Sequence, residues 1–104
     1  MDKPFIMRAA DTIPWRPSTF AAGVFVKDLG SSDGQAMQLV RFEPGARFPR
    51  HEHVGPEFIY ILQGEVIQQG RRLGPGCAAV APADTTEDDF ASETGATFLI
   101  VYTE

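Results

Sequence analysis

Residues 45–64 read GARFPRHEHVGPEFIYILQG, and this segment is the most informative part of the chain. It contains both histidines of the protein, His51 and His53, and Glu57 follows four residues after the second one. Alternate side chains of a strand share a face, so the two imidazoles are expected to point the same way. The VGP bend then allows Glu57, at the start of the next strand, to return its carboxylate to the same point.

Two imidazoles and a carboxylate are a common ligand set for Zn, Mn, Fe(II) or Ni. This set is compatible with a divalent metal ion, and it does not distinguish among these elements. The competing interpretation is a pair of surface histidines, because an isolated H-x-H in an edge strand is more often without function. The bend and Glu57 are the features that favour a metal.

The composition sets limits on the fold and on the partners. A length of 104 residues indicates one domain. Nine basic residues stand against fourteen acidic ones, which excludes a nucleic-acid partner of the usual basic type. No apolar run approaches the roughly 20 residues of a membrane span, so no membrane partner is expected. The single cysteine, Cys77, permits no intrachain disulfide, and without a secretory signal the default compartment is the cytoplasm.

Turn residues divide the chain into short apolar or alternating runs, and no window has the spacing of an amphipathic helix. This pattern predicts an all-β domain, a small antiparallel sandwich or barrel, over residues 20–104. Residues 1–19, with three prolines, are expected to form an extended arm. The predicted strands are 20–28, 35–43, 46–53, 57–63, 65–69, 71–73, 77–81, 85–91 and 96–102.

The segment resembles the first motif of the cupin family, G-x5-H-x-H-x3-E-x6-G, with Gly45, His51, His53, Glu57 and Gly64 in its fixed positions. The surrounding sequence is most similar to small single-domain cupins, among them the acetylacetone-dioxygenase-like proteins and the zinc-binding cupin of a bacterial anti-sigma factor. The resemblance implies a jelly-roll β-barrel of two antiparallel sheets. It also implies a mononuclear divalent metal held by the two histidines and the glutamate.

The second cupin motif, G-x5-P-x-G-x2-H-x3-N, fits residues 76–91 without a gap but only in part. Gly76 and Pro82 match, whereas Asp84, Glu87 and Ala91 replace the glycine, the histidine and the asparagine. The resemblance implies that the fourth ligand, a histidine in the family, is Glu87 here. Alternatively, Glu87 belongs to an exposed acidic loop. The remaining triad would then have open positions, as in non-haem Fe(II) oxygenases.

Four further residues are candidates for contact with a substrate. Alternation predicts Arg47 on the same face as His51, where it would anchor a carboxylate or an enolate; a surface arginine is the other interpretation. Ile59 and Ile61 are expected to follow Glu57 inward and to form an apolar wall. Tyr60, also a candidate for substrate contact, points to the opposite face by the same rule, as a packed aromatic or, alternatively, a catalytic acid.

That opposite face is also apolar, since Phe58 and Leu62 accompany Tyr60 on it. A strand that is apolar on both faces is normally covered on both. The cover is expected to be a second sheet, the N-terminal arm or a partner subunit, and a homodimer is the predicted assembly.

The leading functional hypothesis is a metal-dependent enzyme with a small-molecule substrate, with dioxygenase-like cleavage of a diketone or a related oxygen-chelating compound. The first alternative is a non-catalytic metal- or ligand-binding sensor module. The second, suggested by the incomplete second motif, is a metal-free isomerase or sugar-binding barrel. Fold alone does not choose among them.

Overall fold

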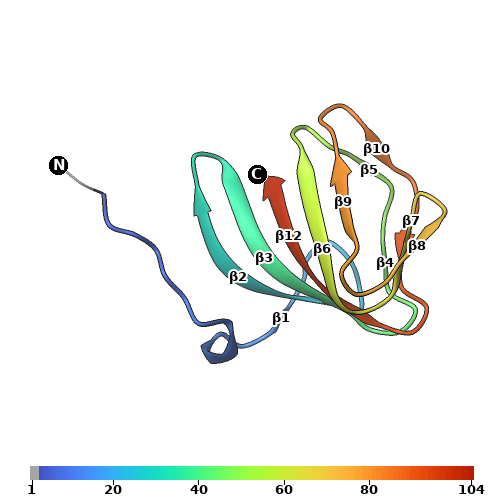
Figure 1. The fold of residues 1–104 in the computed structure, drawn as a ribbon, viewed down its shortest axis with the longest axis horizontal. Helices are drawn as coiled ribbons and strands as arrows, with labels where there is room; N and C mark the ends of the chain where they lie inside the picture. The colour runs from blue at the N-terminus through green and yellow to red at the C-terminus, as the bar shows by residue number, and fades with distance from the viewer. Residues whose placement is uncertain (1–2) are drawn as a thin grey trace.

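The computed structural model describes residues 3–104, which form two layers of antiparallel strands (Figure 1). The predicted all-β class is confirmed: residues 3–104 contain no α-helix, only one 3₁₀ turn, η1 (Ala10–Thr12). No helix in this range is long and apolar enough to cross a membrane. The strands are β1 (Arg16–Pro17), β2 (Val24–Ser32), β3 (Gln35–Phe42), β4 (Arg47–Phe48), β5 (His51–Glu52), β6 (Glu57–Gly64), β7 (Val66–Gln68), β8 (Arg71–Leu73), β9 (Ala78–Ala81), β10 (Thr86–Glu87), β11 (Phe90–Ala91) and β12 (Ala96–Thr103).

One layer is a six-stranded sheet in the order β1-β2-β3-β12-β6-β9. Burial alternates along β6, where Glu57, Ile59 and Ile61 point inward and the residues between them are exposed. The inward faces of the sheet and of the second layer enclose the core. Three phenylalanines, Phe42, Phe90 and Phe98, are its largest fully buried apolar side chains. The alternation read from the sequence therefore placed the buried face of β6 correctly.

The second layer consists of a four-stranded sheet, β4-β11-β7-β8, and the pair β10-β5. Two predicted strands are each broken in two, because 46–53 forms β4 and β5 and 85–91 forms β10 and β11. Pro49 has no N–H for a ladder and interrupts the first. In the second, the N–H groups of Asp88 and Asp89 donate to Gln69 Oε1 instead of to a strand. These breaks let β5 pair with β10 while β4 pairs with β11.

Two glycines of the histidine segment have steric roles. Gly64 has a φ of 73°, and a side chain there would collide with the carbonyl oxygen of Gly95. Gly55, in the bend before β6, lies so close to Thr103 that a Cβ would overlap its side chain. Only glycine fits such approaches, so the bend between His53 and Glu57 can be tight.

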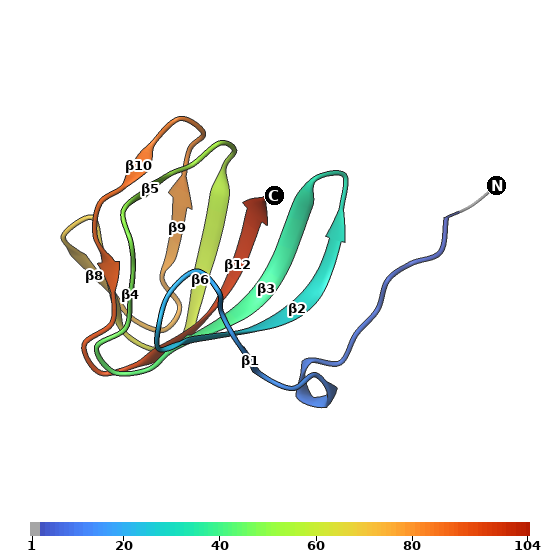
Figure 2. The ribbon, with the colours of Figure 1, turned by 180° about the vertical axis from the view of Figure 1, so that it is seen from behind.

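The N-terminal arm predicted for 1–19 is shorter in the structure, since β1 already pairs with β2; residues 1 and 2 lie outside the described part. Trp15 anchors the arm to the sheet by lying 4.9 Å from both the Lys27 ammonium and the Arg41 guanidinium. Upstream of η1, the chain runs away from the barrel on the side of β2 (Figures 1 and 2).

Candidate metal centre

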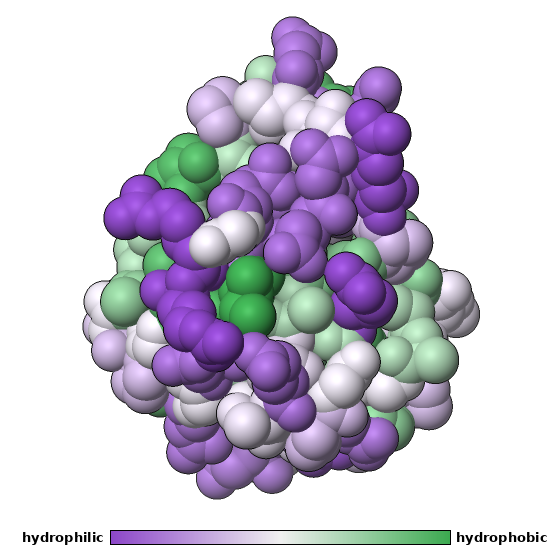
Figure 3. Space-filling model, turned by 90° about the vertical axis from the view of Figure 1, so that its right-hand side faces the viewer, coloured by the Kyte–Doolittle hydropathy of each residue, from purple (hydrophilic) through white to green (hydrophobic). Residues whose placement is uncertain are grey.

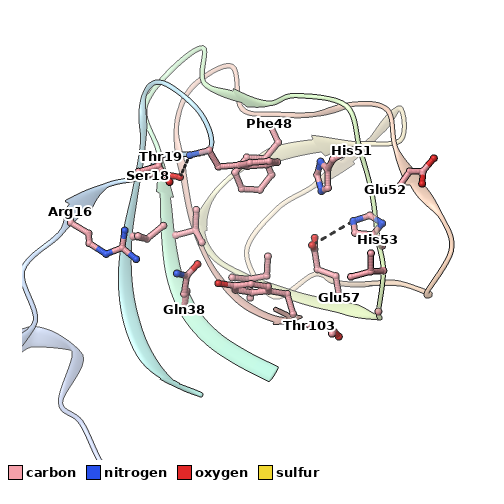
Figure 4. A pocket seen from close by; sticks show the side chains of 17 residues that line it. Arg16, Ser18, Thr19, Gln38, Phe48, His51, Glu52, His53, Glu57 and Thr103 are labelled. Atoms are coloured by element: carbon pink, nitrogen blue, oxygen red, sulfur yellow. Dashed lines mark hydrogen bonds and ion pairs between the residues drawn. The ribbon is translucent and has the colours of Figure 1, made fainter. Parts of the chain in front are cut away.

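The histidines and the glutamate of the first motif meet at one end of an internal cavity (Figure 4). One potential ligand atom from each of His51, His53 and Glu57 lies within 4.8 Å of the other two. His51 comes from β5, His53 follows this strand, and Glu57 opens β6. His53 and Glu57 are buried, and His51 is half-buried. The grouping predicted from the sequence is thus present, and it could hold a metal ion.

The hydrogen bonds of the two imidazoles fix which nitrogen faces the centre. His51 Nδ1 lies 2.8 Å from the carbonyl oxygen of Pro49, which can only accept, so Nδ1 carries the proton. His53 Nδ1 lies 3.1 Å from Thr85 Oγ1, whose own proton is donated to the Pro82 carbonyl. Thr85 must therefore accept from His53. Both rings keep a lone pair on Nε2, and partners of this kind orient metal-binding histidines in proteins.

Two buried polar atoms at the centre have no hydrogen-bond partner among the described residues: His53 Nε2 and Glu57 Oε1. His53 Nε2 is 3.5 Å from Glu57 Oε2, too long for a hydrogen bond. Unpartnered buried polar atoms are rare and need an explanation. Two imidazole lone pairs and one carboxylate are the donor set of a divalent transition metal or zinc, so the residues present fit such an ion.

Glu87, from the second motif, lies beside His53 but outside the grouping of His51, His53 and Glu57. It pairs with His51 across the β5–β10 ladder, so the two side chains leave the strands on the same side. Its carboxylate is 2% exposed; Oε1 lies 4.0 Å from His53 Nε2 and accepts a hydrogen bond of 2.9 Å from Gln68 Nε2. Glu87 is therefore not part of an exposed acidic loop.

The neighbours of Glu87 do behave as an exposed acidic loop. Asp88 and Asp89 form ion pairs with Arg50 and Arg47 on the surface. Glu87 instead lines a second cavity, of about 470 Å³, between β9 and residues of β7, β8 and β10. His53 lines both cavities and so lies between Glu57 on one side and Glu87 on the other.

Two carboxyl groups, of Glu57 and Glu87, are buried close to His53. Burial, with a contribution from the charge of Glu87, raises the pKa of Glu57 to about 7. Two buried carboxylates next to neutral imidazoles repel each other when both are ionised. A bound dication would offset this repulsion, which is a second reason why the donor set fits a metal.

The cavity beside the centre has a volume of about 390 Å³. Phe20 and Phe48 place their rings edge-on toward His51, with ring centres 5.1 and 6.1 Å from it. Arg16 and Gln38 lie on the side opposite the histidines (Figure 4). The remaining wall is largely apolar and includes Val26, Val40, Ile100 and Tyr102.

The structure does not bring the four predicted substrate contacts to this cavity. Arg47 lies on the surface, paired with Asp89 at 3.3 Å, because the break at Pro49 separates its orientation from that of His51. Tyr60 is 46% exposed on the outer face of β6. Ile59 and Ile61 do point inward, as predicted, but they are packed in the core rather than along the cavity wall.

Sequence reasoning missed Arg16 and Gln38. Both are held by Asp28, which accepts from Arg16 at 2.7 and 2.9 Å and from Gln38 at 2.7 Å. These bonds, with the hydrogen bond from Gln38 contributing most, lower the pKa of Asp28. The sequence did contain one signal for Gln38: it is a polar residue between Ala36 and Val40, at a position of β3 where the alternation predicts an inward side chain. Nothing in the sequence indicated Arg16, since β1 is only two residues long.

Comparison with known families and structures agrees with this arrangement. The family model described as "ChrR Cupin-like domain" matches residues 3–104. No curated protein is similar enough in sequence to match.

Several solved structures share the fold. An acetylacetone dioxygenase from Acinetobacter johnsonii superposes with a TM-score of 0.81 at 13% identity, over 99% of this chain and 75% of that one. The polyketide cyclase RemF from Streptomyces resistomycificus gives 0.79 at 21%, over 99% and 80%. The complex of SigE with the anti-sigma ChrR from Rhodobacter sphaeroides gives 0.73 at 23%, over 93% of this chain and 51% of that one. At such identities they establish the cupin fold and not the activity.

Proposed function

The chain belongs to the ChrR cupin-like family, and from this we propose that it binds one divalent metal ion and acts on a small molecule that offers two neighbouring oxygens. The observation that carries the proposal is the orphaned pair His53 Nε2 and Glu57 Oε1 at the end of a cavity of about 390 Å³. The favoured reaction is a dioxygenase-like cleavage of a diketone or a related compound.

His51 and His53, through Nε2, and Glu57 would hold the ion, with Glu87 completing the set from the side of the second motif. The metal would supply Lewis-acid binding of the substrate oxygens and, as Fe(II), activation of O₂. Two carboxylates favour a harder ion such as Mn, Fe(II) or Zn.

The chain's own residues have three tasks in this proposal. The ring edges of Phe20 and Phe48 shield His51 from water. Arg16 faces the metal residues across the cavity, and its positive charge can orient an anionic enolate. Gln38, fixed by Asp28, offers a polar contact in an otherwise apolar wall. A small, flat substrate with an apolar body and oxygens at one end suits a cavity whose walls are largely apolar and whose metal residues lie at one end.

The test is to load the purified protein anaerobically with Fe(II) and to measure O₂ uptake with a panel of β-diketones. Uptake that Glu57→Gln abolishes and Glu43→Gln preserves is the expected result, since Glu43 is exposed and does not line the cavity. Absence of O₂ uptake over the whole panel would refute the dioxygenase. A metal-free barrel predicts that His51→Ala changes neither metal content nor folding.

A second candidate is a metal-binding sensor module. It is favoured by the family itself and by the solved complex of SigE with the anti-sigma ChrR, in which the match covers about half of the matched chain. It predicts stoichiometric metal binding without O₂ uptake. It also predicts a partner protein that is retained by the metal-loaded form and lost by the His53→Ala variant.

A further inference from the structure

The outer face of the six-stranded sheet is apolar where β6 and β9 form it. The alternation that buries Ile59 and Ile61 turns their neighbours outward, and these are large apolar residues instead of polar ones. Large exposed apolar patches on a protein normally mark an interaction site. The exposed fractions are 44% for Phe58, 46% for Tyr60 and 44% for Leu62 on β6 and 60% for Val80 on β9; Met37, on β3 two strands from β6, is 39% exposed.

A second apolar surface lies on the N-terminal arm. Phe5, Ile6 and Met7 are consecutive and are 86%, 59% and 81% exposed. The arm leaves the barrel beside β2 and continues away from it (Figures 1 and 2). In the sheet, β6 is three strands from β2, or about 14 Å, and β9 is four strands away. The arm therefore does not cover the β6–β9 face of its own chain.

The two surfaces together have the size of one half of a stable interface. Large side chains present about 150–250 Å² each, so the exposed parts of these eight residues amount to on the order of 800 Å² per chain. A standard interface takes about 800 Å² from each partner. None of the eight is charged, so the net charge of −5 is carried elsewhere and does not oppose contact here.

Other parts of the surface look different. On the side of the molecule that carries β7, β8 and β10, hydrophilic side chains predominate and apolar ones show only in small separate patches (Figure 3). The large apolar residues of the arm and of the outer sheet face are therefore considered together, while Phe20 and Val54 are exposed elsewhere.

We propose that two copies of this chain form a symmetric dimer in which the Phe5–Met7 segment of each lies on the outer β6–β9 face of the other. The contact is isologous, so both arms and both faces are used at once and the assembly closes as a dimer. The proposal is independent of the metal centre, because the outer face and the cavity lie on opposite sides of the sheet.

The experiment measures mass in solution by light scattering at micromolar concentration, for the full chain and three variants. The acidic-arm variant carries Phe5→Asp and Met7→Asp, and the basic-face variant carries Tyr60→Lys and Val80→Lys. The control variant, Thr94→Lys, changes a residue in an exposed loop. Wild type and control are expected to be dimers. Each double variant alone is expected to be a monomer with an unchanged far-UV circular dichroism spectrum.

Mixing the two double variants tests which surfaces meet. An acidic arm from one chain meets a basic face on the other, while the second pair of surfaces is wild-type, so the mixture is expected to recover the dimer mass. A dimer insensitive to the acidic arm would overturn the docking of the arm, and a monomeric wild type at 100-fold higher concentration than the starting one would overturn the dimer. Failure of the mixture to dimerise would also overturn the arm-on-face contact.

Discussion

The two buried glutamates of the centre, Glu57 and Glu87, come from the two motifs and differ in their surroundings. Glu57 keeps a buried oxygen without a partner, and its pKa is raised to about 7. Glu87 is more deeply buried and already accepts a hydrogen bond from Gln68. They lie on either side of His53, at 3.5 and 4.0 Å from its Nε2.

The difference indicates which groups each of the two motifs contributes around His53. The first motif supplies two buried atoms, His53 Nε2 and Glu57 Oε1, that have no hydrogen-bond partner among residues 3–104 and could bind a cation. The second supplies a carboxylate fixed by Gln68 and a hydroxyl, from Thr85, that orients His53. The glutamate in the histidine position of the second motif thus places a second buried carboxyl group beside His53.

Replacing Glu57 by alanine is expected to have the largest effect. It removes a ligand with free oxygen atoms, so metal affinity should fall by more than about 100-fold, beyond the 10–100-fold of a typical supporting residue. Titration calorimetry with Zn²⁺ or Mn²⁺ measures the change. Glu52→Ala, on the exposed side of β5, is the matched control and should bind as wild type. An unchanged metal affinity in Glu57→Ala would show that Glu57 is not a metal ligand.

The pH dependence of the metal-free protein tests the same carboxyl. Because the folded pKa of Glu57 lies above its ordinary value of 4.5, the folded state binds the extra proton between these values. This contribution to stability is complete below about pH 4.5 and is lost as the pH rises past about 7. The free energy of unfolding should fall by on the order of 3 kcal/mol across this window.

Urea unfolding at several pH values measures this dependence. The Glu57→Gln variant, which has no proton to lose, should show a flatter profile than wild type. Equal slopes for the two proteins would show that the pKa of Glu57 is not raised in the folded state.

Glu87→Ala is expected to have an intermediate effect on metal affinity. In the proposed site Glu87 would contribute from the second motif, but its Oε1 already accepts a hydrogen bond from Gln68, so the loss should be about 10–100-fold, less than for Glu57→Ala. Elemental analysis and calorimetry measure it, with Glu93→Ala, an exposed glutamate, as the control. A loss as large as that of Glu57→Ala would make the two carboxylates equivalent ligands. No loss would make Glu87 purely structural.

The part of this picture that the sequence predicts is the part governed by short-range rules. The spacing of His51, His53 and Glu57 around a glycine-containing bend fixes their meeting point locally, and the alternation along β6 fixes its buried face. The all-β class followed from turn chemistry in the same way. Where adjacent residues determine the geometry, the prediction held.

The predictions that failed depend on contacts distant in sequence. Arg47 was placed by extending one strand through Pro49, whereas the chain changes sheet there. Arg16 reaches the cavity only because β1 joins the edge of β2 and Asp28 fixes its guanidinium. The burial of Glu87, which the resemblance to the second motif implied and the acidic run left open, depends on the pairing of β5 with β10.

The smallest expected effect concerns the hydroxyl of Thr85, which supports the first motif from the second. Thr85→Val removes the acceptor of the His53 Nδ1 proton and frees the ring to change tautomer, at nearly constant volume. Metal affinity should fall by about 10-fold, the lower end for a supporting residue, with the fold intact. Thr86→Val, the same change one residue further along, is the control. If both variants bind the metal like wild type, the orientation of His53 depends on packing against His51 rather than on Thr85, and the second motif contributes only through Glu87.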